Sequence, residues 1–385
     1  MEITPKDLYT SIFKEYPDVL NSKQVSAMLR ITTKEHEALL NRLPSYEGML
    51  FTDLMEEWLE AIKPEIKLST FGGYQLNVQK AIVPYFLERE MLLRELTADD
   101  INMFYGEQLK SVKATTVLKL HANIGKALKY AVEKDYITHS VMDKVKRPKP
   151  EKYVGKFLKQ SEAIELFEAV KGHKLELGVI LGAFYGLRRS EIIGLRWESI
   201  DFDKNTITIE HTVTVTYVDG KQKIIAGDTT KTKSSHRTLP LVPEIRVKLL
   251  DVKAEQEINR KLCGNSYNKT ESYYIYTDAL GNRIKPNYLS TEFPKFLENN
   301  GFRRMRFHDL RHSCASLLLA NGVPLKEIQD WLGHSDFAIT ANTYAHLDYN
   351  SKVASAKAMT WIGSTSLGIR AGVPDDSSAE SVSAP

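Results

Sequence analysis

Six side chains that could transfer protons or bind an anion lie close together near the C-terminal end of the chain. Four of the ten histidines fall between residues 306 and 347, together with an arginine and a tyrosine of interest. The six are His308, Arg311, His312, His334, Tyr344 and His346. Imidazole, guanidinium and phenol groups can surround a metal ion, or they can bind an anion and attack it. The stretch therefore poses a choice between a metal site and an anion site.

A metal site is the weaker of these two interpretations. His308 and His312 are four residues apart and share a helix face, as in zinc-binding helices. However, Asp309 stands where such motifs place a glutamate, and Arg311 would repel a dication. The only two cysteines of the chain are far apart in the sequence and add no ligand cluster. We therefore expect no metal and no other cofactor.

An anion site explains more of the stretch. His308 and Arg311 are three residues apart, so they face the same way on a helix. Gly333 is expected to end the next helix, which puts His334 at a turn of the chain, and Tyr344 lies on a third helix. A guanidinium fork matches a phosphate group, and a phenol can be a covalent nucleophile once its proton is removed. These residues predict a phosphate-binding site that contains its own nucleophile.

Two earlier motifs supply further positive charge. "GLRRSEIIGLRW" puts Arg188 and Arg189 after a glycine, where the backbone can approach a ligand closely, and Glu191 could orient one of them. "TKTKSSHRTLPL" puts Lys231 and Lys233 at a turn next to a predicted strand. Each motif alone is equally consistent with a solvated surface. In combination with the C-terminal stretch they indicate one cationic site.

The composition is that of an ordinary water-soluble protein. The chain has 385 residues, of which 42% are hydrophobic and 26% charged, and its formal net charge is +3. This length can bury two or three separate cores. The N-terminus lacks the pattern of a signal peptide, and no apolar run reaches the roughly 18 residues that a membrane-spanning helix needs. We expect a protein of a reducing cytoplasm with no membrane partner.

The pattern of apolar and polar residues changes along the chain and predicts five segments. Thr alternates with Ile and Val around an Asp-Gly pair between residues 205 and 227, which indicates antiparallel strands, and the chain is expected to return to helix from about Asn287. The segments are a possible helix-turn-helix (1–46), a helical domain (47–147), a basic linker (148–156), a mixed helix-and-strand domain (157–362) and a tail without a core pattern (363–385).

The ordered motifs "GLRRSEIIGLRW", "TKTKSSHRTLPL", "HDLRH", "LGHS" and "TANTYAHL" resemble those of the tyrosine recombinases, or phage-type integrases. The resemblance extends over most of residues 50 to 361, because the preceding helical segment is similar to the core-binding domain of the family. It implies a mainly α (α+β) fold, in which that domain and a mixed catalytic domain with a small antiparallel sheet form a clamp around DNA. The N-terminus departs from the family pattern, since many integrases begin with a β-rich arm-binding domain.

The resemblance also implies roles for individual residues. The catalytic residues that it assigns by position are Arg188, Lys231, His308, Arg311, His334 and Tyr344. Tyr344 would attack a DNA phosphate and form a 3′-phosphotyrosyl link, with His308 as its proton acceptor. Lys231 would protonate the departing 5′ oxygen, with Lys233 as a less favoured substitute. The link conserves the bond energy, so the resemblance implies that no ATP is consumed. It also implies no metal ion, because the cationic side chains take the role of one.

The implied partners are double-stranded DNA and further copies of the chain. The resemblance implies a homotetramer that exchanges strands through a Holliday junction, for integration and excision of a prophage or conjugative transposon. An excisionase-type directionality factor is an optional partner, and the apolar segment 350–363 could pack on its own domain or on a neighbouring protomer. Three alternatives stay open: a type IB topoisomerase, a DNA-binding regulator without chemistry, and a metal-dependent nuclease.

Overall fold

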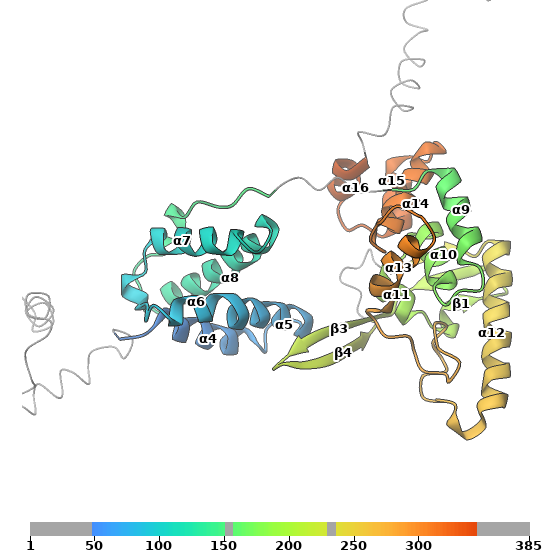
Figure 1. The fold of residues 1–385 in the computed structure, drawn as a ribbon, viewed down its shortest axis with the longest axis horizontal. Coiled ribbons are helices and arrows are strands. Elements are labelled where there is room, and N and C mark those ends of the chain that lie inside the picture. Colours follow the sequence, from blue (N-terminus) through green and yellow to red (C-terminus); the bar gives the residue numbers. More distant parts are fainter. Residues whose placement is uncertain (1–47, 151–156, 229–235, 345–385) are drawn as a thin grey trace, which may run out of the picture. The chain divides into compact units, whose positions relative to one another are not determined.

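The computed structural model describes residues 48–150, 157–228 and 236–344. These residues form two compact units, which we call unit 1 and unit 2 (Figure 1). The possible helix-turn-helix, the end of the basic linker, and the C-terminal tail with its preceding apolar segment lie outside the described residues. Within the described ranges, no helix combines the length and the apolarity needed to cross a membrane.

Unit 1 is helical, as the sequence predicts for this part of the chain. Apolar side chains recur at helical spacing in α4, where Phe51, Leu54 and Trp58 are buried. Thr97 caps α7, because its hydroxyl accepts a hydrogen bond from the Asp100 backbone N–H and the Asp100 carboxylate accepts one from the Thr97 backbone N–H. The main elements are α4 (Phe51–Ile62), α5 (Leu68–Asn77), a π-helical turn η1 (Val78–Ile82), α6 (Val83–Leu87), α7 (Ala98–Leu109) and α8 (Ala114–Glu133).

A segment that is distant in sequence completes the core of unit 1. Residues 216–222, the tip of the hairpin formed by β3 (Thr212–Val218) and β4 (Lys221–Gly227), belong to this unit. Val218 is buried in its hydrophobic core. The Gln75 side chain on α5 donates to Asp219 Oδ1 at 2.8 Å and accepts from the Asp219 backbone N–H at 2.9 Å. The hairpin tip is therefore fixed by both apolar and polar contacts.

Unit 2 is built around α10, a helix with apolar residues on all sides. Such a helix is stable only inside a protein, and α10 packs against both α9 and α14. The helices of this unit are α9 (Gln160–Val170), α10 (Glu176–Phe184), α11 (Arg189–Gly194), α12 (Pro243–Cys263), α13 (Tyr288–Asn299), α14 (Asp309–Ala320), α15 (Leu325–Leu332) and α16 (Phe337–Tyr344).

The antiparallel strands predicted around the Asp-Gly pair are confirmed. Asp219 and Gly220 both have positive φ angles, +52° and +70°, as a tight two-residue hairpin turn requires. A separate three-stranded sheet has the order β1 (Ile200–Asp201), β2 (Thr206–Ile209) and β5 (Arg237–Pro240). The segment with Lys231 and Lys233 thus connects the hairpin to a different sheet, and both lysines lie outside the described residues.

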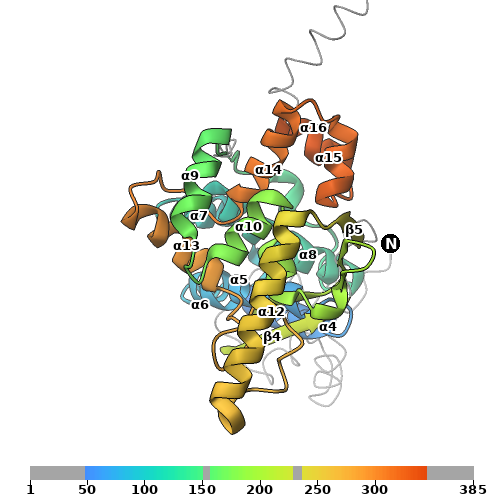
Figure 2. The same ribbon diagram turned by 90° about the vertical axis from the view of Figure 1, so that its right-hand side faces the viewer.

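The long helix α12 was not predicted from the sequence. The expected return to helix near Asn287 is correct for α13, but α12 precedes it by more than 20 residues. Only Ile245 and Leu249 of α12 are buried, whereas Val247 and Ile258 are exposed, so the apolar stripe of this helix is weak. Figure 2 shows α12 in yellow along the side of unit 2.

Candidate active site

The predicted site residues lie on or next to four helices of unit 2, namely α11, α14, α15 and α16, which Figure 1 labels. Arg188 directly precedes α11, His308 and Arg311 stand at the start of α14, His334 follows α15, and Tyr344 ends the described part of α16. The six-residue site implied by the resemblance is thus assembled except for Lys231, which lies outside the described residues together with His346.

Three arginine side chains of the site donate hydrogen bonds to the carbonyl groups at the end of α15. The donor–acceptor distances are 2.8 Å from Arg237 Nε to Trp331 O, 2.6 Å from Arg311 Nη2 to Leu332 O, and 3.2 Å from Arg188 Nη2 to Gly333 O. The C-terminus of a helix carries partial negative charge, which stabilises nearby cations. Gly333 ends α15 in the left-handed conformation, as predicted, with φ +69°. This turn also places His334 beside the arginines.

Glu191 orients Arg188, as the sequence suggested for one of the two adjacent arginines. Its Oε1 lies 2.6 Å from Arg188 Nη1, and its Oε2 accepts from the Arg188 backbone N–H at 2.9 Å. Burial of the Glu191 carboxylate raises its pKa. The positive charges of Arg237 and Arg188 lower this pKa by more, so that it lies at about 2. Arg189 turns away and donates to Ser290 Oγ at 2.8 Å.

Arg311 is a buried cation held by backbone carbonyls. Besides the Leu332 carbonyl, it contacts the Gly186 carbonyl, 2.6 Å from Nη1. Burial, with Arg188 nearby, lowers the pKa of Arg311 to about 9, so Arg311 keeps its charge at neutral pH. A guanidinium has five N–H groups, so two carbonyl contacts leave donors for an anion. Gly186 has φ +64°, and its Cα faces the Leu332 and Cys314 side chains, so the space that a side chain would need is filled.

Tyr344 forms a hydrogen bond with His312. Tyr344 Oη lies 2.7 Å from His312 Nδ1, and the tyrosine side chain is almost completely buried. Burial raises the pKa of Tyr344 and lowers the pKa of His312, so at neutral pH a phenol faces an uncharged imidazole. The resemblance implied this contact for His308, but the structure gives it to the histidine one helical turn later. His312 has the spacing of a zinc ligand relative to His308, and the resemblance assigns it no catalytic role.

The other two histidines of the site are also uncharged at neutral pH. Burial lowers the pKa of His308 to about 4, with a smaller contribution from repulsion by the His312 ring once that ring is protonated. Burial and Arg311 lower the pKa of His334 to about 3. His334 Nδ1 lies 2.8 Å from the hydroxyl of the buried Thr340, a residue that sequence analysis did not single out. When Thr340 donates to Nδ1, the proton resides on Nε2, and His334 becomes a hydrogen-bond donor.

The described part of the chain contains no group of three His, Cys, Asp or Glu side chains arranged to hold a metal ion. The two histidines of the metal interpretation, His308 and His312, lie with their ring centroids 5.4 Å apart in a T-shaped arrangement. The Nδ1 atom of His312 is already engaged by Tyr344.

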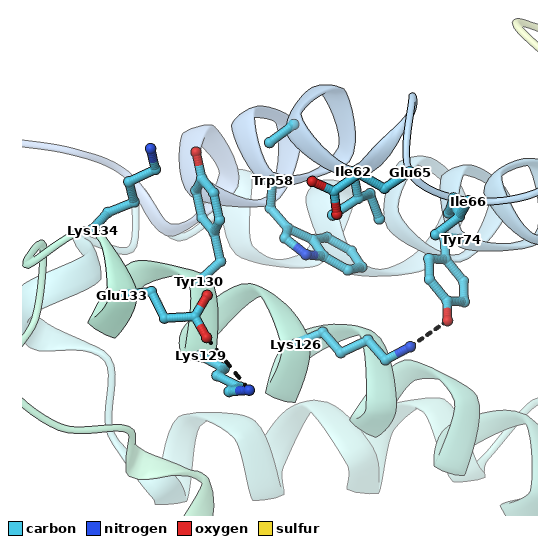
Figure 3. Close-up of a pocket in the computed structure, with 11 residues that line it drawn as sticks. Trp58, Ile62, Glu65, Ile66, Tyr74, Lys126, Lys129, Tyr130, Glu133 and Lys134 are labelled. Atoms are coloured by element: carbon cyan, nitrogen blue, oxygen red, sulfur yellow. Dashed lines mark hydrogen bonds and ion pairs between the residues drawn. The ribbon is translucent and has the colours of Figure 1, made fainter.

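On unit 1, α4, α5 and α8 enclose a groove that is lined by three lysines and by Glu65 and Glu133 (Figure 3). Lys126 of α8 donates to Tyr74 Oη and lies 4.7 Å from the centroid of that ring. Tyr74 in turn stacks on Trp58 at a centroid distance of 5.7 Å. The exposed residues of α8 follow one face of the helix and include Lys119, Lys126 and Lys129. The face thus carries three lysines, of which Lys129 lies 3.4 Å from Glu133 Oε1.

Comparison with known proteins agrees with this geometry. The phage integrase family matches residues 156–351, and the N-terminal SAM-like domain of phage integrases matches residues 50–107. A tyrosine recombinase XerC-like protein of Caldanaerobacter subterraneus subsp. tengcongensis is 30% identical over 316 residues, which cover 78% of this chain and 80% of that protein. The ICEBs1 integrase of Bacillus subtilis is 24% identical over 338 residues, or 86% of either chain.

Solved structures show the same fold. The Tn1549 transposon integrase in complex with transposon right end DNA has a TM-score of 0.65 at 17% identity, covering 81% of this chain and all of that chain. The lambda integrase of a tetramer bound to a Holliday junction has a TM-score of 0.58 at 15% identity, covering 88% and 85% of the two chains. Since the family match spans residues 156–351 and a 30% identical relative is covered over most of its length, the chain belongs to the phage integrase family, the DNA strand-transferring tyrosine recombinases.

Proposed function

We propose that this tyrosine recombinase is the integrase of a prophage or conjugative transposon and that Tyr344 is its nucleophile. The observation that carries the proposal is the 2.7 Å hydrogen bond between Tyr344 and an uncharged His312, next to arginines gathered at the end of α15. The enzyme would cut and rejoin double-stranded DNA during integration and excision in the bacterial cytoplasm. Relatives named as integrases, such as the ICEBs1 integrase, support this assignment.

The proposed reaction transfers a phosphoryl group without hydrolysis. Tyr344 Oη forms a bond to the scissile phosphorus while the bond to the 5′ oxygen breaks. The phenol proton passes to His312 Nδ1, which takes the role that the resemblance gave to His308. Lys231 is the proposed donor of a proton to the departing 5′ oxygen. In the second step, the 5′ hydroxyl of the other DNA partner attacks the phosphotyrosyl link and releases Tyr344, so ATP is not consumed.

The cations of the site stabilise the charge that develops on the phosphate. Arg188 and Arg311 are proposed to bind its non-bridging oxygens, and His334 to donate a further hydrogen bond. Preorganised donors of this kind contribute about 3–4 kcal/mol each to transition-state binding. His308, uncharged and packed against His312, is proposed to support the proton acceptor.

DNA binding would involve both units. We assign the lysine face of α8 in unit 1 to the phosphate backbone, because Lys119, Lys126 and Lys129 project from one side of a single helix. The basic linker 148–156 is a further candidate contact. The lambda integrase was solved as a tetramer on a Holliday junction, which supports a homotetramer as the active assembly of this chain as well. An excisionase-type factor would set the direction of recombination.

Replacement of Tyr344 tests the proposed function. Wild-type protein, incubated in EDTA with nicked duplexes that carry the ends of its element, should form a covalent adduct visible on a denaturing gel. Tyr344→Phe should bind the same duplex and form none, since the nucleophilic oxygen is missing. Tyr276→Phe is the matched control, because it removes another buried tyrosine hydroxyl, the one that donates to Lys174 O at 2.6 Å.

The outcomes separate the alternatives. An adduct that persists in Tyr344→Phe, or tight binding of wild type to a recombining site with no adduct, would refute the assignment of the nucleophile. Cleavage that disappears in EDTA would point to the metal-dependent nuclease. Joining of strands from two separate duplexes distinguishes a recombinase from a type IB topoisomerase, which reseals the strand that it cut.

The pH dependence of the cleavage rate should reflect the protonation state of His312. Because burial lowers its pKa below the usual 6.5, the ring is neutral at neutral pH and can accept the Tyr344 proton. Protonation removes the acceptor, so the rate at subsaturating DNA should be constant near neutral pH and fall with a midpoint below 6.5. His312→Gln should be slower and lack this decline. A midpoint above 6.5, or an unchanged decline in His312→Gln, would contradict the role of His312.

A further inference from the structure

We propose that Arg237 is a positioning residue that keeps Arg188 available to the DNA phosphate by neutralising Glu191. Arg237 begins β5 and lies within the motif "TKTKSSHRTLPL", in which only Lys231 and Lys233 were expected to have a role. The inference rests on the proposed function, because it concerns the phosphate that Tyr344 would attack. Arg237 itself would touch neither DNA nor the reacting atoms.

The contacts of Arg237 point into the protein and away from solvent. Its side chain is 6% exposed, and its two Nη atoms lie 3.0 Å from Glu191 Oε2 and 3.4 Å from Glu191 Oε1. The Nε atom donates to Trp331 O at 2.8 Å. A planar guanidinium is suited to this combination, since its two Nη atoms engage both carboxylate oxygens while Nε donates to a third acceptor.

Glu191 is shared between two arginines that have different surroundings. Arg188 reaches the carboxylate at 2.6 Å, yet its side chain is 33% exposed and can meet a ligand. Glu191 is 2% exposed and therefore has no water to stabilise its charge. Without Arg237, the full charge of this carboxylate would act on Arg188. An incoming phosphate would then compete with Glu191 for the same guanidinium.

With Arg237 present, Glu191 can hold Arg188 in place without cancelling its charge. Arg188 and Arg237 both contact this carboxylate, and the charge of Arg311 also acts on it, which leaves an excess of positive charge for an anion. The shared C-terminal turn of α15 fixes all three, since each donates to a different one of its last three carbonyls. Arg237 thus balances the charge of Glu191 and bonds the same helix end that holds Arg188 and Arg311.

A purely structural role is the competing explanation, because buried ion pairs can often be replaced by apolar side chains without loss of stability. The two roles differ in what happens when Glu191 is neutralised. If Arg237 acts by balancing charge, then removal of the carboxylate charge should compensate for loss of the arginine. If Arg237 only packs the interior, a second substitution beside it should not restore chemistry.

The test compares Arg237→Met, Arg237→Lys and the double variant Arg237→Met with Glu191→Gln. The readouts are the single-turnover rate of covalent adduct formation on a saturating nicked duplex, the Kd for that duplex, and the melting temperature. Arg246→Met is the matched control, because Arg246 also bonds a backbone carbonyl, that of Phe202, and lies 2.9 Å from Asn205 Oδ1. All rates are measured below the lowest melting temperature.

We expect Arg237→Met to slow adduct formation about 100-fold, the scale of a misplaced catalytic group, with Kd changed by no more than about twofold. The double variant should be about tenfold faster than Arg237→Met, and Arg237→Lys, which keeps the charge, should stay within about tenfold of wild type. Arg246→Met should react like wild type.

Other results would overturn the inference. These are an Arg237→Met rate close to wild type, a double variant no faster than Arg237→Met, or an Arg237→Lys rate as low as that of Arg237→Met. If Arg237→Met does not fold, the rate of Arg237→Lys alone decides. A wild-type protein that binds the duplex without forming an adduct would instead refute the proposed function, so the two failures are distinguishable.

Discussion

Arg188→Met should slow formation of the phosphotyrosyl adduct by about 10²- to 10³-fold, the loss typical for removal of one preorganised donor to a developing oxyanion. Methionine keeps most of the length of the side chain but carries no charge. The variant also loses the bonds to Glu191 and Gly333 O, so the buried carboxylate would retain Arg237 alone. Binding of the DNA duplex should change much less, because many other phosphates contribute to it.

The adjacent arginine provides the control for this prediction. Arg189→Met removes the same charge from the next residue, whose Nη1 donates to Ser290 Oγ at 2.8 Å outside the site. Single-turnover rates and filter-binding affinities should be measured for both variants on the same nicked duplex. Equal loss of rate in the two variants would mean that general positive charge, and not the position of Arg188, is responsible.

Gly186→Ala should destabilise unit 2 by about 2–5 kcal/mol, from left-handed strain and overpacking together. Gly186 has φ +64°, and an added Cβ would lie 2.4 Å from Leu332 Cδ2 and 3.3 Å from Cys314 Sγ. For a unit of this size, such a loss lowers Tm by roughly 5–15 °C. Adduct formation should fall as well, because the Gly186 carbonyl accepts from Arg311.

Gly172→Ala separates the effect of left-handed backbone strain from the effect of overpacking. Gly172 has φ +71°, but an added Cβ would meet no atom within 4 Å. This variant should therefore show only the backbone strain, about 1–2 kcal/mol, and normal cleavage. Thermal denaturation followed by circular dichroism measures both losses. Similar Tm values for the two variants would show that the contact with Leu332 adds nothing.

Local patterns in the sequence were sufficient to predict several parts of the site. Gly333 ends α15 because a left-handed residue is needed there, and glycine adopts that conformation without strain. Glu191 reaches Arg188 because residues three apart in the first turn of a helix can cap each other. The strands around Asp219 and Gly220 follow from alternation and turn chemistry. Each of these features depends only on neighbouring residues.

The contacts that the sequence did not reveal depend on tertiary packing. Arg237 contacts Glu191 although 46 positions separate them in the sequence. Tyr344 contacts His312 although 32 positions separate them. Whether His308 or His312 contacts Tyr344 depends on how α16 packs against α14, because both histidines lie on the same face of α14. The helix α12 was missed for a related reason. Several of its apolar residues are exposed, so the sequence shows no clear helical periodicity there.

The assignment of residues 216–222 to unit 1 means that the polypeptide passes from one unit to the other three times. A single peptide-bond break within 151–156 would therefore not yield two independent fragments. The C-terminal fragment would still carry Val218 and Asp219, which fill the core of the N-terminal fragment and pair with Gln75. The nicked molecule would migrate as one species on a sizing column and separate only in denaturant. Conversely, residues 48–150 produced alone would expose a patch of apolar core at the place that Val218 occupies.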